Sequence, residues 1–411
     1  MKSKLAIEGG KPVRTEPWPS WPYFEQDEID AACAVLRSGR VNYWTGEEVR
    51  LFEKEFAEFL GVKYSIAVAN GSVALELALE TLDIGHGDEV IVPNRTFIAS
   101  ASCCVMRAAI PIFTDVDNNS QNITAESIRN VMTPKTRTII CVHLAGWACE
   151  MDEIMSLAKE NKLYVIEDCA QALGGIYKGQ MLGTMGHVAT FSFCQDKIMT
   201  TGGEGGMLVT NDNSLYRRAW SYKDHGKDFD FYINGIKKES YYTSLGTNWR
   251  MTEMQASIGR VALKKVPIWI KQRQQFAATL NQGLKDVPGI RLTFPLDYIN
   301  HAYYKYYVFI KPEELKEGWD RDRIMNSIAA EGIVCKSGVT SDIGNESGWR
   351  TAKLVGNKIA KDLKLKEHLP VDNKLGKTAL MFQVHPTLDD QAIQDTIKAV
   401  KKVMDAAAKK A

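Results

Sequence analysis

The sequence has almost no net charge and no long apolar run. Its 51 basic and 50 acidic side chains leave a formal charge of +1. Composition therefore gives no support for binding the phosphate backbone of nucleic acids or an acidic membrane surface. No stretch reaches the ~18 apolar residues of a membrane-spanning helix, and the apolar core of the N-terminal segment is too short for a secretory signal. We expect a cytoplasmic protein without nucleic-acid or membrane partners.

Paired cysteines are also lacking. None of the eight cysteines belongs to a Cys-x-x-Cys pair. Most lie within apolar runs, where a thiol behaves as a small hydrophobic side chain. No spacing of histidine and cysteine fits a zinc site. We expect the cysteines to be reduced and buried, and we expect no metal.

Between residues 64 and 210 the chain alternates short apolar runs with helical patterns. This alternation predicts an α/β fold with a mostly parallel sheet that is covered on both faces. Ligands of such sheets bind at the carboxyl ends of the strands. The predicted strands are 64–69, 89–93, 111–115, 138–143, 163–168, 188–193 and 207–210, and the predicted helices are 47–60, 71–79, 98–106 and 151–161.

The pattern changes towards the C-terminus. We expect a large α/β domain over residues 42–262, and a smaller α+β domain formed by residues 1–41 and 263–411. The elements predicted around and beyond this boundary are a long helix at 253–283, a strand at 302–310 and amphipathic helices at 321–331 and 389–406.

Two segments are predicted to be irregular. The first 40 residues are rich in proline and tryptophan, and we expect an extended arm that needs a surface to pack on. Residues 223–243 are predicted to form a long polar and aromatic loop. Loops of such length in compact domains are usually functional or disordered.

One lysine stands between an apolar segment and a glycine-rich turn. Lys197 follows the predicted strand 188–193 and precedes the turn 202–206, and another apolar run upstream ends in Asp168. Pyridoxal phosphate chemistry needs such a pair: an amine that forms the Schiff base, and a carboxylate that keeps the pyridine nitrogen protonated. Alone, Asp168 is better explained as a helix cap. Together with Lys197, it favours the cofactor.

The turn after the first predicted strand offers an anion site. Asn70, Gly71 and Ser72 open a helix, and backbone N–H groups at a helix N-terminus beside a hydroxyl suit a phosphate. Ser72 could equally be an ordinary helix cap. Phe97 follows the second predicted strand, where it could stack on an aromatic ring, although a place in the core is the simpler interpretation.

Five ordered blocks carry a more specific signal. They resemble the DegT/DnrJ/EryC1/StrS family of sugar aminotransferases, and the resemblance runs from about residue 6 to the block 384–387. Three departures leave the substrate open but not the cofactor: an extra glycine in 202–206, Trp147 where a proline is common, and the long 223–243 loop. The five blocks are 85–93 with Thr96-Phe97, 142–146 with Met151-Asp152, 167–174, 192–197 with 200–206, and 246–251.

The resemblance implies a fold-type-I pyridoxal phosphate enzyme. Its large domain would be a three-layer α/β/α sandwich beside a smaller α+β C-terminal domain. Lys197 resembles the Schiff-base lysine, Asp168 the partner of the pyridine nitrogen, and Gln171 the residue beside the phenolic oxygen of the cofactor. One branch of the family has histidine in place of this lysine and is a dehydratase. The presence of Lys197 disfavours that branch.

The resemblance also implies the remaining cofactor contacts. Gly71, Ser72 and Ser192 correspond to phosphate contacts, and Phe97 occupies the ring-stacking position. Asn248 resembles a phosphate ligand that the second subunit donates. We therefore expect a homodimer with shared active sites.

The expected reaction is transfer of an amino group from L-glutamate or L-glutamine to a keto or aldehydo sugar. The acceptor stays open among a nucleotide-linked hexose, an eight-carbon sugar acid and a keto-inositol. An aromatizing dehydratase of the aminohydroxybenzoate type is an alternative enzyme on the same scaffold. A non-catalytic regulator is the other class, but the catalytic set is complete and no DNA-binding appendage is visible.

Overall fold

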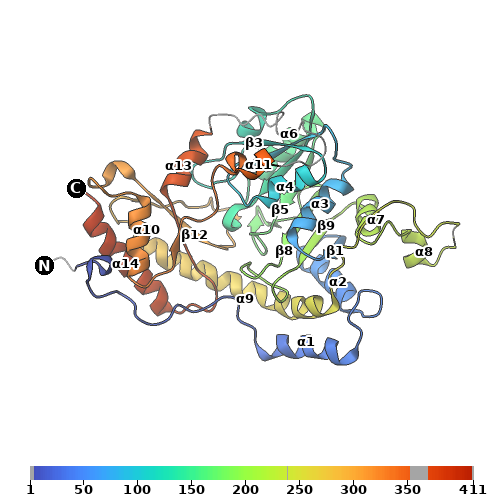
Figure 1. Ribbon diagram of the computed structural model, residues 1–411, viewed down its shortest axis with the longest axis horizontal. Coiled ribbons are helices and arrows are strands. Elements are labelled where there is room, and N and C mark those ends of the chain that lie inside the picture. Colours follow the sequence, from blue (N-terminus) through green and yellow to red (C-terminus); the bar gives the residue numbers. More distant parts are fainter. Residues whose placement is uncertain (1–3, 238, 352–368, 410–411) are drawn as a thin grey trace.

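A seven-stranded sheet forms the centre of the larger part of the protein (Figure 1). The computed structural model describes residues 4–237, 239–351 and 369–409. The strand order is β1-β9-β8-β5-β4-β2-β3. The strands are β1 Tyr64–Val68, β2 Glu89–Pro93, β3 Ile110–Thr114, β4 Thr136–Val142, β5 Tyr164–Asp168, β8 Val188–Ser192 and β9 Gly206–Thr210.

Every strand of this sheet except β9 runs in the same direction. The neighbouring pairs among β3, β2, β4, β5 and β8 are parallel, whereas β9 is antiparallel to both β8 and β1. The physical reason is the short connection 193–205, which carries Lys197 and contains no crossover helix. The expectation of a mostly parallel sheet is confirmed.

Helices cover both faces of the sheet, as the side-chain alternation of the strands requires. In β4, Ile139 and Cys141 face the core under α2, α6 and α9, whereas Ile140 and Val142 face the core under α3, α4 and α7. The expected three-layer α/β/α arrangement is confirmed. The helices are α2 Glu48–Leu60, α3 Gly71–Thr81, α4 Ala99–Met106, α5 Ala125–Arg129, α6 Met151–Asn161, α7 Asn213–Tyr222 and α9 Glu253–Leu284.

The smaller part packs helices on one face of a four-stranded antiparallel sheet of order β10-β12-β14-β13. Helix α9 belongs to the cores of both parts, and the expected boundary at 262–263 falls inside it. The division into domains thus stays a prediction. The elements are β10 Ile290–Arg291, β12 Tyr306–Ile310, β13 Cys335–Lys336, β14 Ala379–Phe382, α10 Arg321–Ala330, α11 Gly348–Thr351, α13 Pro370–Thr378 and α14 Asp390–Ala407.

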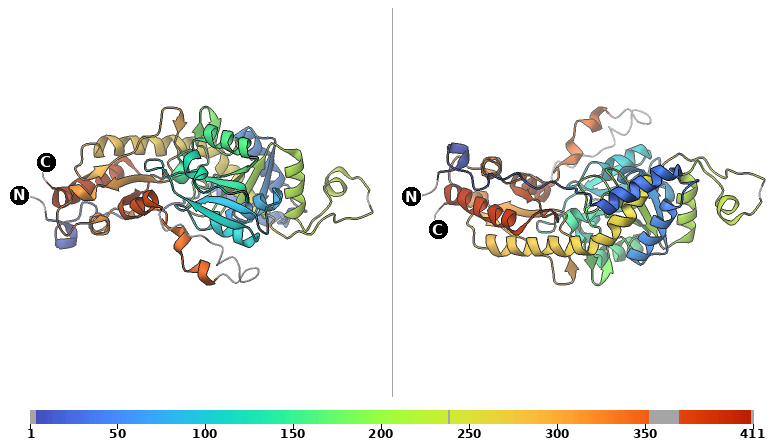
Figure 2. Two further views of the ribbon diagram at one scale, coloured as in Figure 1. Left: turned by 90° about the horizontal axis from the view of Figure 1, so that it is seen from above. Right: turned by 90° about the horizontal axis from the view of Figure 1, so that it is seen from below.

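The N-terminal arm is not extended throughout, so that expectation is wrong in part. Residues Gln26–Ser38 form α1, which lies against α9 on the underside of the molecule (Figure 2). A capping box between Glu25 and Glu28 starts the helix, and Gly39 ends it in a left-handed conformation. Lys265 of α9 pairs with carboxylates of this first turn. The proline-rich stretch before α1 masked this local helix signal.

Two further predictions need correction. The segment 223–243 is not all loop, because Asp228 caps a short helix, α8 Phe229–Asn234, in the arm that projects from the body (Figure 1). The strand expected at 302–310 begins only at Tyr306. Before it, Ala302 and Tyr304 donate backbone hydrogen bonds to the 145–146 turn of the larger part instead of to a strand. A small third sheet joins β6 Ile176–Tyr177, β7 Gln180–Met181 and β11 Ile299–Asn300.

All eight cysteines are free thiols, as expected. Six are buried, but Cys33 and Cys194 are partly exposed, so the expectation of burial fails for these two. Among the described residues, no helix combines the length and the apolar character needed to cross a membrane.

Candidate active site

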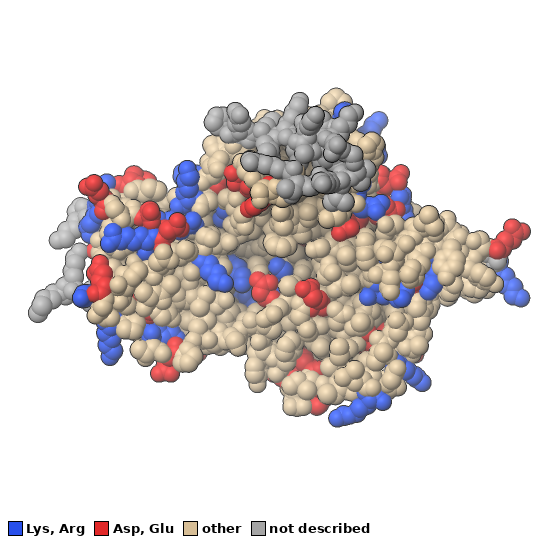
Figure 3. Space-filling view, viewed as in Figure 1, with Lys and Arg blue, Asp and Glu red and all other residues tan. Residues whose placement is uncertain are grey.

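A cavity of about 720 Å³ lies between the carboxyl ends of the central strands and the small sheet. Figure 3 shows a hollow near the middle of one face, with basic and acidic side chains gathered beside it. Seven of the eight residues singled out from the sequence line the cavity, and Asn248 does not. The seven are Gly71, Ser72, Phe97, Asp168, Gln171, Ser192 and Lys197.

Asp168 is the last residue of β5 and is 3% exposed. Its Oδ2 accepts a hydrogen bond from the Ser100 hydroxyl (2.8 Å), and its Oδ1 accepts one from the Ala170 N–H (3.1 Å). Burial raises the pKa of Asp168, although Ala170, Ser100 and Lys197 oppose the shift. A buried carboxylate of this kind gains from a cationic hydrogen-bond donor. A protonated pyridine nitrogen has that chemistry.

Lys197 points its amine into the cavity beside Asp196. The two side chains form an ion pair (Nζ to Oδ1, 3.7 Å), and the amine lies 5.0 Å from the centre of the Tyr304 ring. The backbone carbonyl of Lys197 accepts a hydrogen bond from the Trp21 indole N–H (2.8 Å). Burial would raise the pKa of Asp196, but Lys197, the Tyr304 hydroxyl and Lys305 outweigh it and hold that pKa below its usual value.

The turn from β1 to α3 forms a tight cradle that lines the cavity. Asn70 caps α3 by accepting a hydrogen bond from the Val73 N–H (3.0 Å). This leaves the first N–H groups of the helix, from Gly71 and Ser72, without a partner inside the helix. A Cβ on Gly71 would lie only 2.7 Å from the Cβ of Ser192, so these two chain segments approach as closely as glycine allows. The N-terminus of α3 beside two serine hydroxyls suits a phosphate.

Gln171 and Phe97 complete the wall on this side. The side-chain oxygen of Gln171 accepts a hydrogen bond from the Ala145 N–H (2.9 Å), which leaves the amide NH₂ group as the end able to donate elsewhere. Phe97 is 63% exposed and lines the cavity, so the simpler interpretation of it as a core residue is wrong. An exposed aromatic ring in a cavity offers a flat surface for a planar ligand.

Asn248 lies outside the cavity of its own chain. It is exposed, and its side-chain oxygen accepts a hydrogen bond from the Arg250 N–H (3.3 Å). Its backbone bridges to Asp224, near the base of the projecting arm. Its expected role needs a second copy of the chain and stays a prediction.

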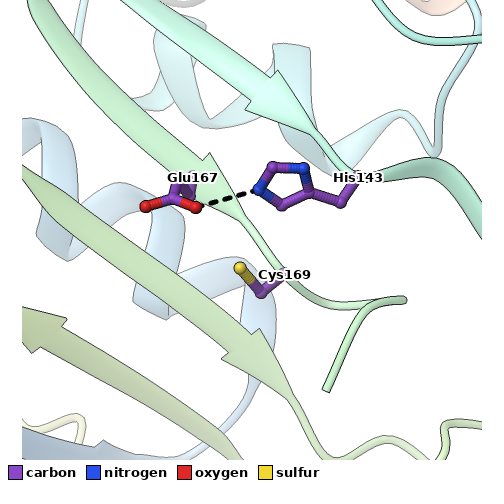
Figure 4. A group of neighbouring side chains, drawn as sticks. All are labelled: His143, Glu167 and Cys169. Atoms are coloured by element: carbon purple, nitrogen blue, oxygen red, sulfur yellow. Dashed lines mark hydrogen bonds and ion pairs between the residues drawn. The ribbon is translucent and has the colours of Figure 1, made fainter. Parts of the chain in front are cut away.

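A buried cluster of His143, Glu167 and Cys169 lies next to Asp168 (Figure 4). The Nδ1 of His143 accepts a hydrogen bond from the Cys149 N–H (3.0 Å), so its Nε2 carries the proton and donates to Glu167 (3.0 Å). Burial would raise the pKa of Glu167, but His143 and backbone N–H groups outweigh it and lower that pKa. Because both imidazole nitrogens are engaged, the cluster is a structural support of β5.

Sequence reasoning missed several residues of the cavity. Ser100, Tyr304 and Lys305 approach Asp168 or Lys197 only through the fold, from a helix and from the distant small part. Asp196 could have been found, because it directly precedes Lys197. Lys305 also left a signal: it is the one lysine inside the aromatic run 302–310.

A model of the DegT/DnrJ/EryC1/StrS aminotransferase family matches residues 22–401. The chain belongs to this family. It is therefore an aminotransferase that depends on pyridoxal phosphate. The resemblance seen in the five blocks is confirmed, and so is the expected enzyme class.

This aminotransferase is similar to two sequence relatives and to one solved structure in particular. It is 37% identical to GDP-perosamine synthase of Escherichia coli O157:H7 over 69% of this chain and 74% of that protein. It is 31% identical to a putative L-glutamine:3-amino-2,3-dideoxy-scyllo-inosose aminotransferase of Micromonospora echinospora over 98% of each chain. The crystal structure of an aminotransferase from Psychrobacter cryohalolentis covers 95% of this chain and 99% of its own, with 47% identity and a TM-score of 0.90.

Proposed function

We propose that this aminotransferase moves an amino group from L-glutamate or L-glutamine to a keto or aldehydo sugar in the biosynthesis of an amino sugar. The supporting observation is that Lys197 and Asp168 line the same cavity, in a chain whose relatives are sugar aminotransferases. The cavity of about 720 Å³ is large enough for a cofactor together with a small substrate.

The residues of the cavity fit pyridoxal phosphate. Bound there, the cofactor supplies an electron-withdrawing ring that accepts the negative charge developing at the α-carbon of the donor. Asp168 would hold the ring nitrogen protonated, and Gln171 would donate its amide to the phenolic oxygen. Lys197 would hold the cofactor and then move a proton to and from the α-carbon.

The phosphate of the cofactor would be held by the turn from β1 to α3 and by Ser192. Gly71 and Ser72 would donate backbone N–H groups from the start of α3, and Ser192 would add its hydroxyl. Phe97 would cover one face of the ring. These roles follow from the family resemblance and are compatible with the close approach of Gly71 to Ser192.

We also propose a homodimer in which Asn248 of one copy completes the phosphate site of the other. The exposed position of Asn248, away from its own cavity, supports this. The test mixes two variants, Lys197→Ala and Asn248→Ala, by unfolding and refolding them together. A shared site predicts that the mixture regains activity above either variant alone, because hybrids contain one intact site. No gain would contradict the sharing.

A keto-inositol is the second candidate acceptor. It is favoured by the match to the Micromonospora protein, which extends over 98% of both chains. The match therefore includes the smaller C-terminal part and the projecting segment 223–243. Purified protein assayed with a nucleotide-linked keto sugar and with a keto-inositol would separate the two. Aromatization of the acceptor without amination would instead favour the dehydratase.

The decisive experiment addresses Lys197. Incubation with pyridoxal phosphate and then borohydride should attach the cofactor covalently to the peptide that contains Lys197. Lys197→Ala should lose this adduct and all turnover while keeping the wild-type melting temperature. Lys401→Ala, an exposed change on α14, is the matched control. Transamination retained by Lys197→Ala would refute the assignment.

A further inference from the structure

The small sheet turns one face to its own core and the other to the cavity. Along β12, Tyr306 and Val308 belong to the core beneath α10 and α14, whereas Tyr307 lines the cavity. Tyr307 is paired with Met381 of β14, and Met381 with Lys336 of β13. These three side chains form one row on the cavity side of the sheet, as strand alternation requires.

A second row lies one step along the same face and places a lysine near Lys197. Lys305 directly precedes β12, and Gln383 directly follows β14. Both residues line the cavity. The Lys305 amine lies 3.7 Å from Oδ2 of Asp196, whereas the Lys197 amine lies 3.7 Å from Oδ1 of the same carboxylate. The two amines therefore flank one carboxylate, from opposite walls of the cavity.

More positive than negative groups surround the amine of Lys305. Burial lowers the pKa of Lys305 to about 8; Asp196 opposes this shift, whereas Arg273, Lys197 and Lys336 add to it. Arg273 is itself 1% exposed, and two of its side-chain nitrogens have no hydrogen-bond partner. A group of cations that shares a single carboxylate, with some of its members buried, is stabilised by a further anion.

Gln383 is oriented to assist such an anion. Its side-chain oxygen accepts a hydrogen bond from the Trp18 indole N–H (2.7 Å). Because indole nitrogen can only donate, this contact fixes which end of the amide is the oxygen. The NH₂ group of Gln383 is then the end able to donate into the cavity.

We propose that Lys305, with Lys336 and Gln383, forms a subsite that binds a carboxylate group of a substrate. The proposal deepens the proposed function and rests on it for the identity of the substrates. In a donor amino acid, the α-carboxylate carbon lies about 2.5 Å from the amine nitrogen. A donor whose amine replaces that of Lys197 on the cofactor therefore keeps its carboxylate close to the Lys197 position. Lys305, which shares the Asp196 carboxylate with Lys197, is a cation of the facing wall. The donor is therefore the expected source of this carboxylate, and an acidic sugar is the other source.

The test uses two non-reacting probes, glutarate for the donor and D-glucuronate for an acidic sugar. Each is titrated calorimetrically into the cofactor-loaded protein at pH 8, in buffers of different ionisation enthalpy. Lys305→Met should weaken binding of one probe at least about tenfold, the usual weight of a charged hydrogen bond. Lys305→Arg should retain most of the affinity, and Lys336→Met should have a smaller effect because Lys336 is exposed. Lys401→Met is the matched control.

Weaker glutarate binding by Lys305→Met would support the subsite and assign it to the donor. Weaker D-glucuronate binding alone would support it and assign it to the acceptor. Unchanged affinity for both probes, in a variant with wild-type cofactor content and melting temperature, would overturn the proposal. The titrations measure binding and need no turnover. An enzyme that is inactive with every sugar would therefore refute the proposed function, whereas the binding data would still test the subsite.

Discussion

Asp168 and Lys305, one on each wall of the cavity, are held in different ways. On the wall made by the central strands, Asp168 has two hydrogen bonds at 2.8 and 3.1 Å and is 3% exposed. On the wall made by the small sheet, Lys305 faces its carboxylate partner at 3.7 Å, beyond hydrogen-bond distance.

This difference teaches what each wall is suited to hold. Groups locked by short hydrogen bonds lose little on binding a ligand of fixed shape, such as a cofactor. Long side chains with loose partners can adapt to a substrate that enters and leaves in each cycle. We therefore expect substitutions on the wall made by the central strands to reduce activity strongly. Substitutions on the wall made by the small sheet should reduce substrate affinity by smaller amounts.

Among the substitutions that leave Lys197 in place, the largest effect is expected from Asp168→Asn, on the wall made by the central strands. A neutral amide stabilises a positive charge on the ring nitrogen much less than a carboxylate does, so kcat should fall by about 10²–10³-fold, as when a preorganised electrostatic group is removed. Steady-state kinetics with the cofactor bound measure it. An activity within a factor of a few of the wild type would break the comparison.

A smaller effect is expected from Gly71→Ala, which adds a Cβ 2.7 Å from that of Ser192. Relieving such an overlap typically costs about 1–3 kcal/mol, so cofactor affinity should fall by about 5- to 150-fold. Titration of the apoprotein with pyridoxal phosphate measures this. Gly85→Ala is the control, because its nearest neighbour would be 3.6 Å away. Equal affinities in the two variants would contradict a tight cradle.

On the wall made by the small sheet, Lys305 should make the KM of the anionic substrate depend on pH. The cationic form of Lys305 binds a carboxylate, and burial lowers its pKa to about 8. The KM of the anionic substrate should therefore be constant well below pH 8 and rise above it, by about tenfold per unit at most. Lys305→Arg should remove the rise, because arginine stays protonated. A KM of the wild type that stays constant between about pH 7 and 9 would contradict the role of Lys305 in binding the substrate.

The smallest effect is expected from Trp21→Phe, which keeps an aromatic ring but removes the indole N–H that donates to the Lys197 carbonyl. One such bond contributes about 0.5–1.5 kcal/mol, so kcat/KM should fall by about two- to tenfold. The ring would keep its edge contact with Trp269. Trp319→Phe, outside the cavity, is the control. A fall in kcat/KM of more than 100-fold would mean that Trp21 holds Lys197 as firmly as Ser100 and Ala170 hold Asp168.

Local pattern was enough for the strands and for the residues at their ends. Asp168 and Lys197 were found because each follows a short apolar run, and a parallel sheet brings such ends to one edge. Helix α1 was missed because proline and tryptophan dominate the arm before it. The strand at 302–310 was predicted too long, because its first residues bond to a turn far away in the sequence.

The sequence by itself determined the alternating strands and helices, the family, and a lysine and a carboxylate at neighbouring strand ends. These depend on periodicity and on motifs within a few residues of one another, where the chain fixes the spacing. Only the tertiary structure decided that Lys305 shares the Asp196 carboxylate with Lys197, and that Ser100 supports Asp168. Those contacts join residues 68 to 109 positions apart, and no local spacing encodes a distance that packing alone creates.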